Sequence, residues 1–187
     1  MSTEQSKPLS KEEKLKERKY MGSILTALGL IVGYVLVYFI GRVICLGWPW
    51  EAYSWRWWLN HSSPTSFSYM YGWLIHNNVF WAVMIVTVIV AILGKYRFSL
   101  SCSAGFLIGM VLGELFGDHL SSVAWDHRGF EIWLGILLLS AVMGVFLEKG
   151  AKKGDSWLAN WFALWCGVFL VGVVAIVPIV WLLCPYK

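Results

Sequence analysis

Charged side chains are scarce in this sequence, and several long stretches have none. Only 14% of the 187 residues are charged, whereas a soluble domain has about 25%. Because the charges are segregated, long apolar runs remain between them, and such runs are typical of membrane-spanning helices. The composition disfavours a soluble fold and predicts an all-α, polytopic integral membrane bundle.

The sequence also lacks the motifs of soluble enzymes. It has no HExxH, no Walker A loop, no dinucleotide-binding fingerprint and no nucleophile elbow. Its four cysteines form no CxxC pair, so a zinc site is disfavoured. We therefore predict no catalytic residue and no metal site, and the sequence identifies no cofactor.

Five apolar segments are candidates for spans, each of which needs about 20 residues. They cover residues 22–44, 73–93, 98–116, 132–147 and 158–183. The fourth segment is short, so we expect its helix to include Phe130 and Glu131. The first is too long for the apolar region of a signal peptide and precedes no Ala-x-Ala site, which predicts a retained span.

The N-terminal residues 1–20 are polar and basic. Ser10 and Glu13 have the spacing of a capping box, which predicts a cytoplasmic helix that runs into the first span. A disordered basic tail is the alternative. The chain thus divides into this tail and a single transmembrane bundle, residues 21–187.

Basic residues indicate the orientation of the bundle. Three segments that fall on one side of five spans hold eleven of the fifteen basic residues: Lys7, Lys11, Lys14, Lys16, Arg18, Lys19, Lys95, Arg97, Lys149, Lys152 and Lys153. The positive-inside rule places that side in the cytoplasm and the C-terminus outside. We expect the membrane to be a plasma membrane. By the same rule, the net charge of +4 reflects basic residues that flank spans in a lipid bilayer, so no nucleic-acid partner is expected.

The outer loop 46–72 is rich in tryptophan. Five of the thirteen tryptophans lie between Trp48 and Trp58, and indole rings favour the membrane–water boundary. The loop is expected to lie on the outer face as an aromatic belt. An aromatic lid over an outward pocket, or a re-entrant or interfacial helix, remains an alternative.

Glycines recur at every fourth position in the third span. The stripe, which we interpret as a glycine zipper, consists of Gly105, Gly109, Gly113 and Gly117. Glycines at this spacing let another helix backbone approach closely. Gly29 and Gly33 in the first span offer a candidate partner stripe, and self-association is the alternative.

Polar residues collect at the predicted outer ends of the spans. The candidate mouth consists of His76, Asn77, Glu114, Asp118, His119, Asp126, His127 and Glu131. Acids within spans usually face a bundle interior or a water-filled cavity, so Glu114 is a candidate for proton or solute entry. A solvated, interfacial acid is the competing interpretation.

Two cysteines map to outer helix ends. Cys45 and Cys184 have the same predicted depth, so an oxidising compartment could join them if the first and fifth spans are neighbours. Cys102 and Cys166 map to the inner half, where thiols stay reduced.

In size, predicted span number and tryptophan content the chain resembles the tryptophan-rich sensory protein family, which implies a five-helix ligand-binding bundle. That family's Trp-Thr-x-Leu-Tyr pattern is missing, and the corresponding stretch reads MYGWLIHNN. Its size and long first outer loop are also similar to substrate-binding subunits of energy-coupling transporters, which have six spans.

The sequence thus favours a binding or accessory subunit that assembles with itself or with other membrane proteins. A small solute or ion transporter or channel subunit, entered at the polar mouth, is the alternative, and an intramembrane enzyme ranks third.

The topology is testable by cysteine labelling in a cysteine-free background. We expect an impermeant thiol reagent, added from outside, to label residues 55 and 127 but not residues 95 and 152, because the positive-inside rule places the last two in the cytoplasm. Labelling of residue 152 from outside would overturn the orientation.

Overall fold

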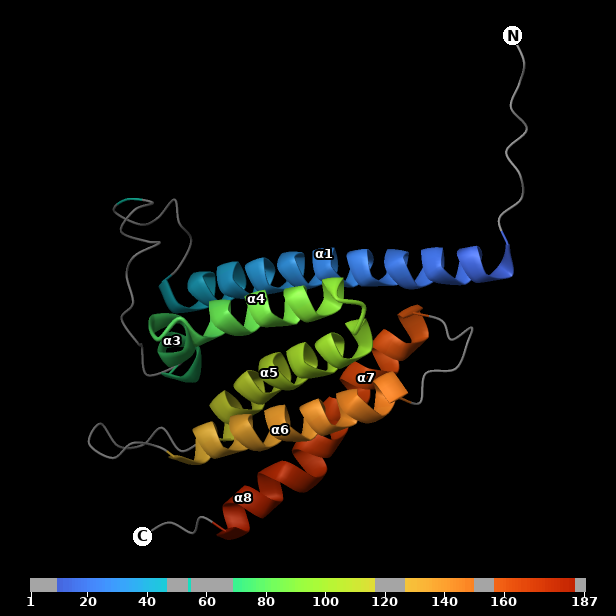
Figure 1. Ribbon diagram of the computed structural model, residues 1–187. Coiled ribbons are helices and arrows are strands. Elements are labelled where there is room, and N and C mark those ends of the chain that lie inside the picture. The colour runs from blue at the N-terminus through green and yellow to red at the C-terminus, as the bar shows by residue number, and fades with distance from the viewer. Residues whose placement is uncertain (1–9, 47–53, 55–68, 117–126, 150–156, 184–187) are drawn as a thin grey trace.

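In the computed structural model, the described residues are 10–46, 54, 69–116, 127–149 and 157–183, and they contain helices but no strand. The helices pack lengthwise as a bundle, with α3 across one end (Figure 1). In chain order they are α1 (Lys11–Leu46), α3 (Tyr69–His76), α4 (Val79–Ile92), α5 (Tyr96–Phe116), α6 (His127–Lys149), α7 (Trp157–Val171), the π-helical turn η1 (Gly172–Ile176) and α8 (Val177–Leu183). The predicted all-α bundle is confirmed.

Four helical stretches are long and apolar enough to cross a membrane. They are Lys11–Ile44, Tyr96–Phe116, Arg128–Lys149 and Ala163–Leu183. The helix α4 is also apolar but has 14 residues, which give about 21 Å at 1.5 Å per residue. That is less than the hydrocarbon thickness of about 30 Å, so the fifth span stays a prediction.

The first helix is continuous from the polar tail into the apolar segment. Ser10 N–H donates to a Glu13 carboxylate oxygen at 2.7 Å, and Glu13 N–H donates to the Ser10 hydroxyl at 3.2 Å, which confirms the capping box. The Ser10 N–H, and to a smaller extent the Ser10 hydroxyl, lower the pKa of the Glu13 carboxyl. The 36 residues of α1 give about 54 Å, so the polar first turns extend beyond the other helices (Figure 1).

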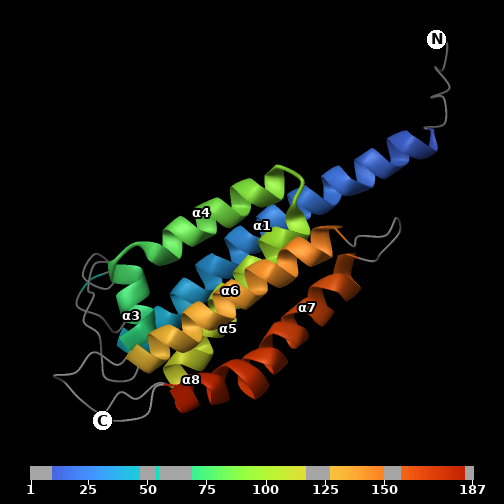
Figure 2. The ribbon, with the colours of Figure 1, turned by 60° about the horizontal axis from the view of Figure 1, so that its bottom comes forward.

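The second predicted span is two helices, not one continuous helix. Asn78 adopts a left-handed conformation, with φ of 57°, between α3 and α4. Asparagine tolerates this region better than most residues because its short polar side chain can bond locally. The break turns α3 across the end of the bundle (Figures 1 and 2).

A tight turn joins α4 to α5. Gly94 has φ of +84°, and its N–H donates to the Ala91 carbonyl while Lys95 N–H donates to the Val90 carbonyl. This is the Schellman pattern, in which glycine supplies the left-handed residue after a helix. The turn sends α5 back beside α4.

The helix α5 is the centre of the bundle. Of its apolar stretch 72% is buried, against 22%, 28% and 22% in the other three candidate spans. An aromatic-rich cluster on one side of α5 includes Tyr34, Phe80, Phe106 and Trp133. An aliphatic cluster on the other side joins α5 to α6, α7 and α8, and Figure 2 shows α4 and α7 on opposite sides of α5.

The glycine stripe of α5 faces α6. A Cβ on Gly109 would lie 3.0 Å from the Trp133 carbonyl oxygen, and one on Gly113 would lie 2.5 Å from the Gly129 carbonyl oxygen. A Cβ on Gly105 would collide with the Ser140 side chain. The helices therefore meet backbone to backbone, the approach that small residues permit in membranes.

The proposed partner stripe in the first span does not take part in this contact. A Cβ on Gly29 or on Gly33 would meet nothing within 4 Å. The expectation that α1 seats the glycines of α5 is wrong, because α6 occupies that face along its length. Gly117 lies outside the described residues.

Buried hydroxyl groups link α5 to three neighbours. Tyr34 on α1 donates to Ser103 at 3.3 Å, and Ser99 donates to the Thr87 carbonyl on α4. Ser101 donates to the Ser140 carbonyl on α6. A buried polar group without a partner is costly, so these bonds fix how the helices meet.

The C-terminal span contains a π-helical turn immediately before Pro178. Proline has no N–H to donate four residues back, to Val174, and its ring would clash with that carbonyl in a regular α-helix. A widened turn at Gly172–Ile176 accommodates both effects. The turn also seats Gly172 against Leu112 and Ile136, so α7 and α8 pack as one unit on the α5–α6 pair.

The α5–α6 contact predicts that Gly109→Leu destabilises the protein. The leucine side chain would overlap the Trp133 backbone, and overpacking of this kind costs about 1–3 kcal/mol. Thermal unfolding in detergent should show a lower midpoint. Gly29→Leu is the matched control, since its side chain meets open space; equal midpoints for the two variants would contradict the contact.

Candidate functional site at the predicted outer end

The described candidate polar residues lie at the end of the bundle where α1, α5 and α8 finish and α6 begins (Figure 1). The sequence predicts that this end faces outside, and we call it the predicted outer end. The opposite end holds the α4–α5 turn and the C-terminus of α6. We call it the basic end because Lys95, Arg97 and Lys149 lie there and the Lys19 side chain reaches Gly94.

Part of the predicted mouth is outside the described residues. Asp118, His119 and Asp126 belong to this part. His76 is the last residue of α3 and His127 is the first of α6, and their side chains are not described. Most of the tryptophan-rich loop is likewise not described, although its final residues form the start of α3.

The two asparagines at the end of α3 serve the backbone. The Asn77 side-chain amide donates to the Trp73 carbonyl at 2.9 Å, which satisfies a carbonyl in the last turn of the helix. Asn78 supplies the left-handed residue that starts α4. Both side chains are exposed, so their first role is to shape the chain between the helices.

Glu114 and Glu131 lie near the Gly113–Gly129 contact, at one end of the α5–α6 pair. Glu114 follows Gly113, and Glu131 lies two residues after Gly129. Both side chains are half-buried and both interact with other groups. The structure therefore places two of the predicted acids at the same end of the α5–α6 pair.

A buried arginine that the sequence did not single out lies at the same end of the bundle, against α8. The Arg128 guanidinium lies 4.4 Å from the centroid of the Trp181 ring on α8, and Arg128 is 7% exposed. Trp181 Nε1–H donates to the Phe116 carbonyl at 3.2 Å. The three residues tie α5, α6 and α8 together.

A second buried arginine lies near the end of α1. Arg42 is 6% exposed, and its Nε donates to the Tyr38 hydroxyl at 3.1 Å. The Tyr38 ring in turn lies 5.0 Å from Trp81 on α4. Arg42 therefore lies where α1 packs on α4, whereas Arg128 lies against Trp181 on α8.

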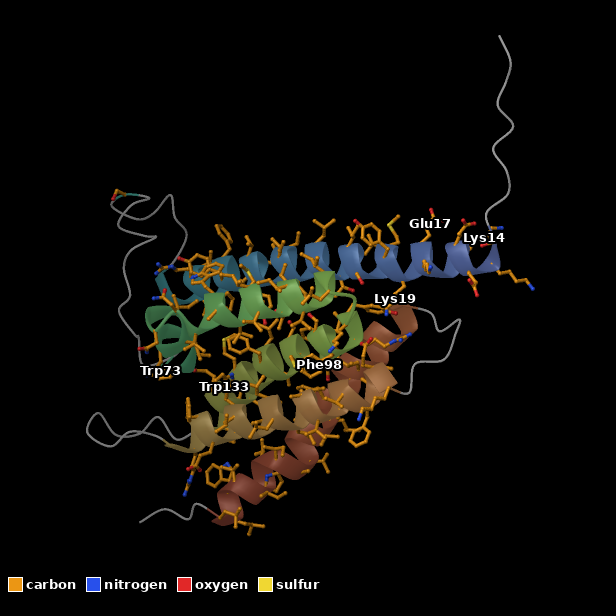
Figure 3. The ribbon with its side chains drawn as sticks, viewed as in Figure 1. Lys14, Glu17, Lys19, Trp73, Phe98 and Trp133 are labelled. Atoms are coloured by element: carbon orange, nitrogen blue, oxygen red, sulfur yellow. The ribbon has the colours of Figure 1, made fainter. Side chains whose placement is uncertain are left out.

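Aromatic rings of α3 and α6 pack against one another at the predicted outer end. Trp73 and Phe130 meet edge to face at 5.5 Å, and Phe130 and Trp133 lie 5.1 Å apart. Figure 3 shows Trp73 and Trp133 toward the predicted outer end. The arrangement is a packed aromatic layer beneath α3.

The possible disulfide stays a prediction. Cys184 and the Cys45 side chain are not described, whereas Cys102 and Cys166 are free thiols. The helix α8 packs on α6 and the π turn, and α1 packs on α4 and α5. The packing thus gives no support for the adjacency of the first and fifth spans that motivated the pairing.

The described groups at the predicted outer end suit binding and anchoring. Arginine recognises carboxylates and phosphates, and it stacks on aromatic faces. Within the described ranges, no three His, Cys, Asp or Glu side chains are placed to hold a metal ion.

Comparisons of the chain with protein-family models, with curated proteins and with solved structures found no match.

Sequence reasoning missed Arg42, Arg128 and Trp181 for a physical reason. A charge or an indole at the end of an apolar run is the ordinary pattern of a membrane boundary. Their pairing with rings on other helices depends on helix order, which a single sequence does not give. Arg42, inside an apolar run, was the one available signal.

Substitutions of Trp181 separate its two interactions. Trp181→Phe keeps a ring for Arg128 but removes the N–H, so we expect a loss of about 1 kcal/mol. Trp181→Leu also removes the ring and should cost about 0.5–2 kcal/mol more. Chemical or thermal unfolding measures both; Leu182→Ala, at a side chain that is 80% exposed, is the control. Equal effects of all three changes would contradict a role for this contact.

Proposed function

We propose that this chain is a small accessory or binding subunit of a membrane assembly, located in the plasma membrane. Its role would be to hold other membrane proteins, or further copies of itself, within the bilayer. The observation that carries the proposal is the open outward face of α1, which stands in contrast to the packed interior of the bundle.

The outward face of α1 is apolar and is not covered by other described helices. Leu25, Val32 and Leu36 are about half exposed, and Gly29 and Gly33 meet nothing within 4 Å. Glycines four residues apart favour helix association in membranes. A face of this kind can accept the backbone of another span where bulkier side chains would keep it away.

The described interior supports a packing role more than a conducting role. Its buried polar residues are Ser23, Thr26, Arg42, Thr87, Ser99, Ser101, Ser103, Arg128 and Ser140. They are hydroxyl groups and two arginines near the predicted outer end, and no acid is buried among the described residues. Paths for ions or protons usually show acids or water-filled cavities at depth.

A small transporter or channel subunit is the second candidate. The half-buried Glu114 and Glu131 at one end of the α5–α6 pair favour it, because a half-buried carboxyl at a helix end can exchange protons with an outward mouth. In this proposal, flux would depend on Glu114.

The two functions are distinguished by assembly and flux. In native membranes, Gly29→Leu and Gly33→Leu should reduce the size of the complex on native gels while leaving the thermal midpoint unchanged. Gly167→Leu is the matched control, since this glycine on α7 also meets nothing within 4 Å. The purified protein should give no gradient-driven ion flux in liposomes.

Two results would count against the accessory subunit and for the transporter. A complex of unchanged size in both α1 variants would remove the support that α1 gives to an accessory role. Flux that disappears in Glu114→Gln, with the fold intact by thermal melt, would establish the transporter, because glutamine keeps the shape and hydrogen bonding of glutamate without its charge.

A further inference from the structure

Three cationic side chains gather at the basic end, outside the site described above. Lys19 on α1 reaches across the α4–α5 turn, and its Cε and Nζ lie 3.6 and 3.9 Å from the position of a Cβ on Gly94. Lys95 follows Gly94 and is exposed, and Arg97 lies in the first turn of α5. Figure 3 shows Lys19 on the side of α1 that faces the turn and Glu17 on the opposite side.

These three positive charges have no ion-pair partner in the part of the chain that the structure describes. Neither Lys19, Lys95 nor Arg97 forms an ion pair with a residue that the structure describes. The guanidinium of Arg97 lies over the Tyr96 ring at 5.1 Å, and its buried Nε has no hydrogen-bond partner. The nearby Glu148 carboxylate accepts instead from Phe98 N–H, at 3.4 Å.

Apolar side chains border the same patch. Ile92 and Leu93 at the end of α4 are 61% and 73% exposed, and Tyr20 and Met21 on α1 are 68% and 51% exposed. The patch therefore lies where the apolar helix surfaces end, which is the level of a membrane surface. A ligand that fits it has an anionic group and an apolar body.

We propose that Lys19, Lys95 and Arg97 bind the headgroup phosphate of an anionic phospholipid in the leaflet at the basic end, with its acyl chains beside Ile92 and Leu93. Lysine and arginine both bind phosphate, and arginine can do so with two parallel hydrogen bonds. Basic sites between helices at one membrane surface are suited to phospholipid headgroups. A soluble phosphate compound would use the same cations but would leave the apolar border unused.

Native mass spectrometry of the purified full-length protein tests the site. Phosphatidylglycerol is titrated against phosphatidylcholine, and glycerol 3-phosphate is added as the soluble counterpart. We expect phosphatidylglycerol to be retained in preference. Lys19→Gln and Arg97→Gln should each weaken its binding about fivefold, since one basic charge near a membrane contributes about 1 kcal/mol.

Two further variants keep the test decisive. Lys11→Gln removes the same charge from the same helix, more than two turns from Lys19, and should leave binding unchanged. Arg97→Lys keeps the charge and should retain most of the binding even where Arg97→Gln disturbs the fold. Equal retention of the two lipids, equal loss in Lys11→Gln, or displacement by glycerol 3-phosphate would each overturn the proposal.

Discussion

The backbone contact between α5 and α6 is the constraint on which the rest of the bundle depends. Lipid tails are as apolar as leucine, so helices in a membrane gain little from hiding leucine and associate through close contact and hydrogen bonds. Gly113 meets the Gly129 carbonyl, and Gly144 on α6 meets the Phe98 backbone at the other end. Held at both ends, the pair offers one surface to α1 and α4 and another to α7 and α8.

The hydroxyl bonds depend on that contact and extend it. Ser101 reaches the Ser140 carbonyl because the glycines bring the two helices together, and its neighbours Ser99 and Ser103 point to α4 and α1. One short sequence, SLSCS, thus bonds to three helices. The buried arginines lie elsewhere: both are near the predicted outer end, where facing aromatic rings offset part of the cost of burying their charge.

Local signals made most of the fold predictable. The capping box at Ser10, the close-packing role of glycines at four-residue spacing and the extension of α6 to Phe130 follow from rules that involve a few neighbouring residues. The partner of the glycines was not predictable in this way, although Gly129, Ser140 and Gly144 supply matching small residues. The break at Asn78 was hidden because apolar residues continue on both sides of it.

The candidate site was less predictable than the fold, since it depends on which helix ends meet. Glu114 and Glu131 were identified as polar residues at helix ends, but their common position near the Gly113–Gly129 contact follows only from the packing of α5 on α6. Asp118, His119 and Asp126, the candidates in the loop after α5, lie outside the described residues.

The helix α1 contributes both to the outward glycine face and to the cationic patch at the basic end. It packs on α4 and α5 through one face, from Gly22 to Arg42, and leaves the other face to the bilayer. At the basic end its contacts include the α4–α5 turn, where Gly22 meets the Tyr96 ring and Lys19 crosses Gly94. A phosphate held between Lys19 and Arg97 would join α1 to α5 by charge, beside the contact of Gly22 with the Tyr96 ring. It would thereby fix the angle at which the outward face of α1 is presented to a neighbouring helix.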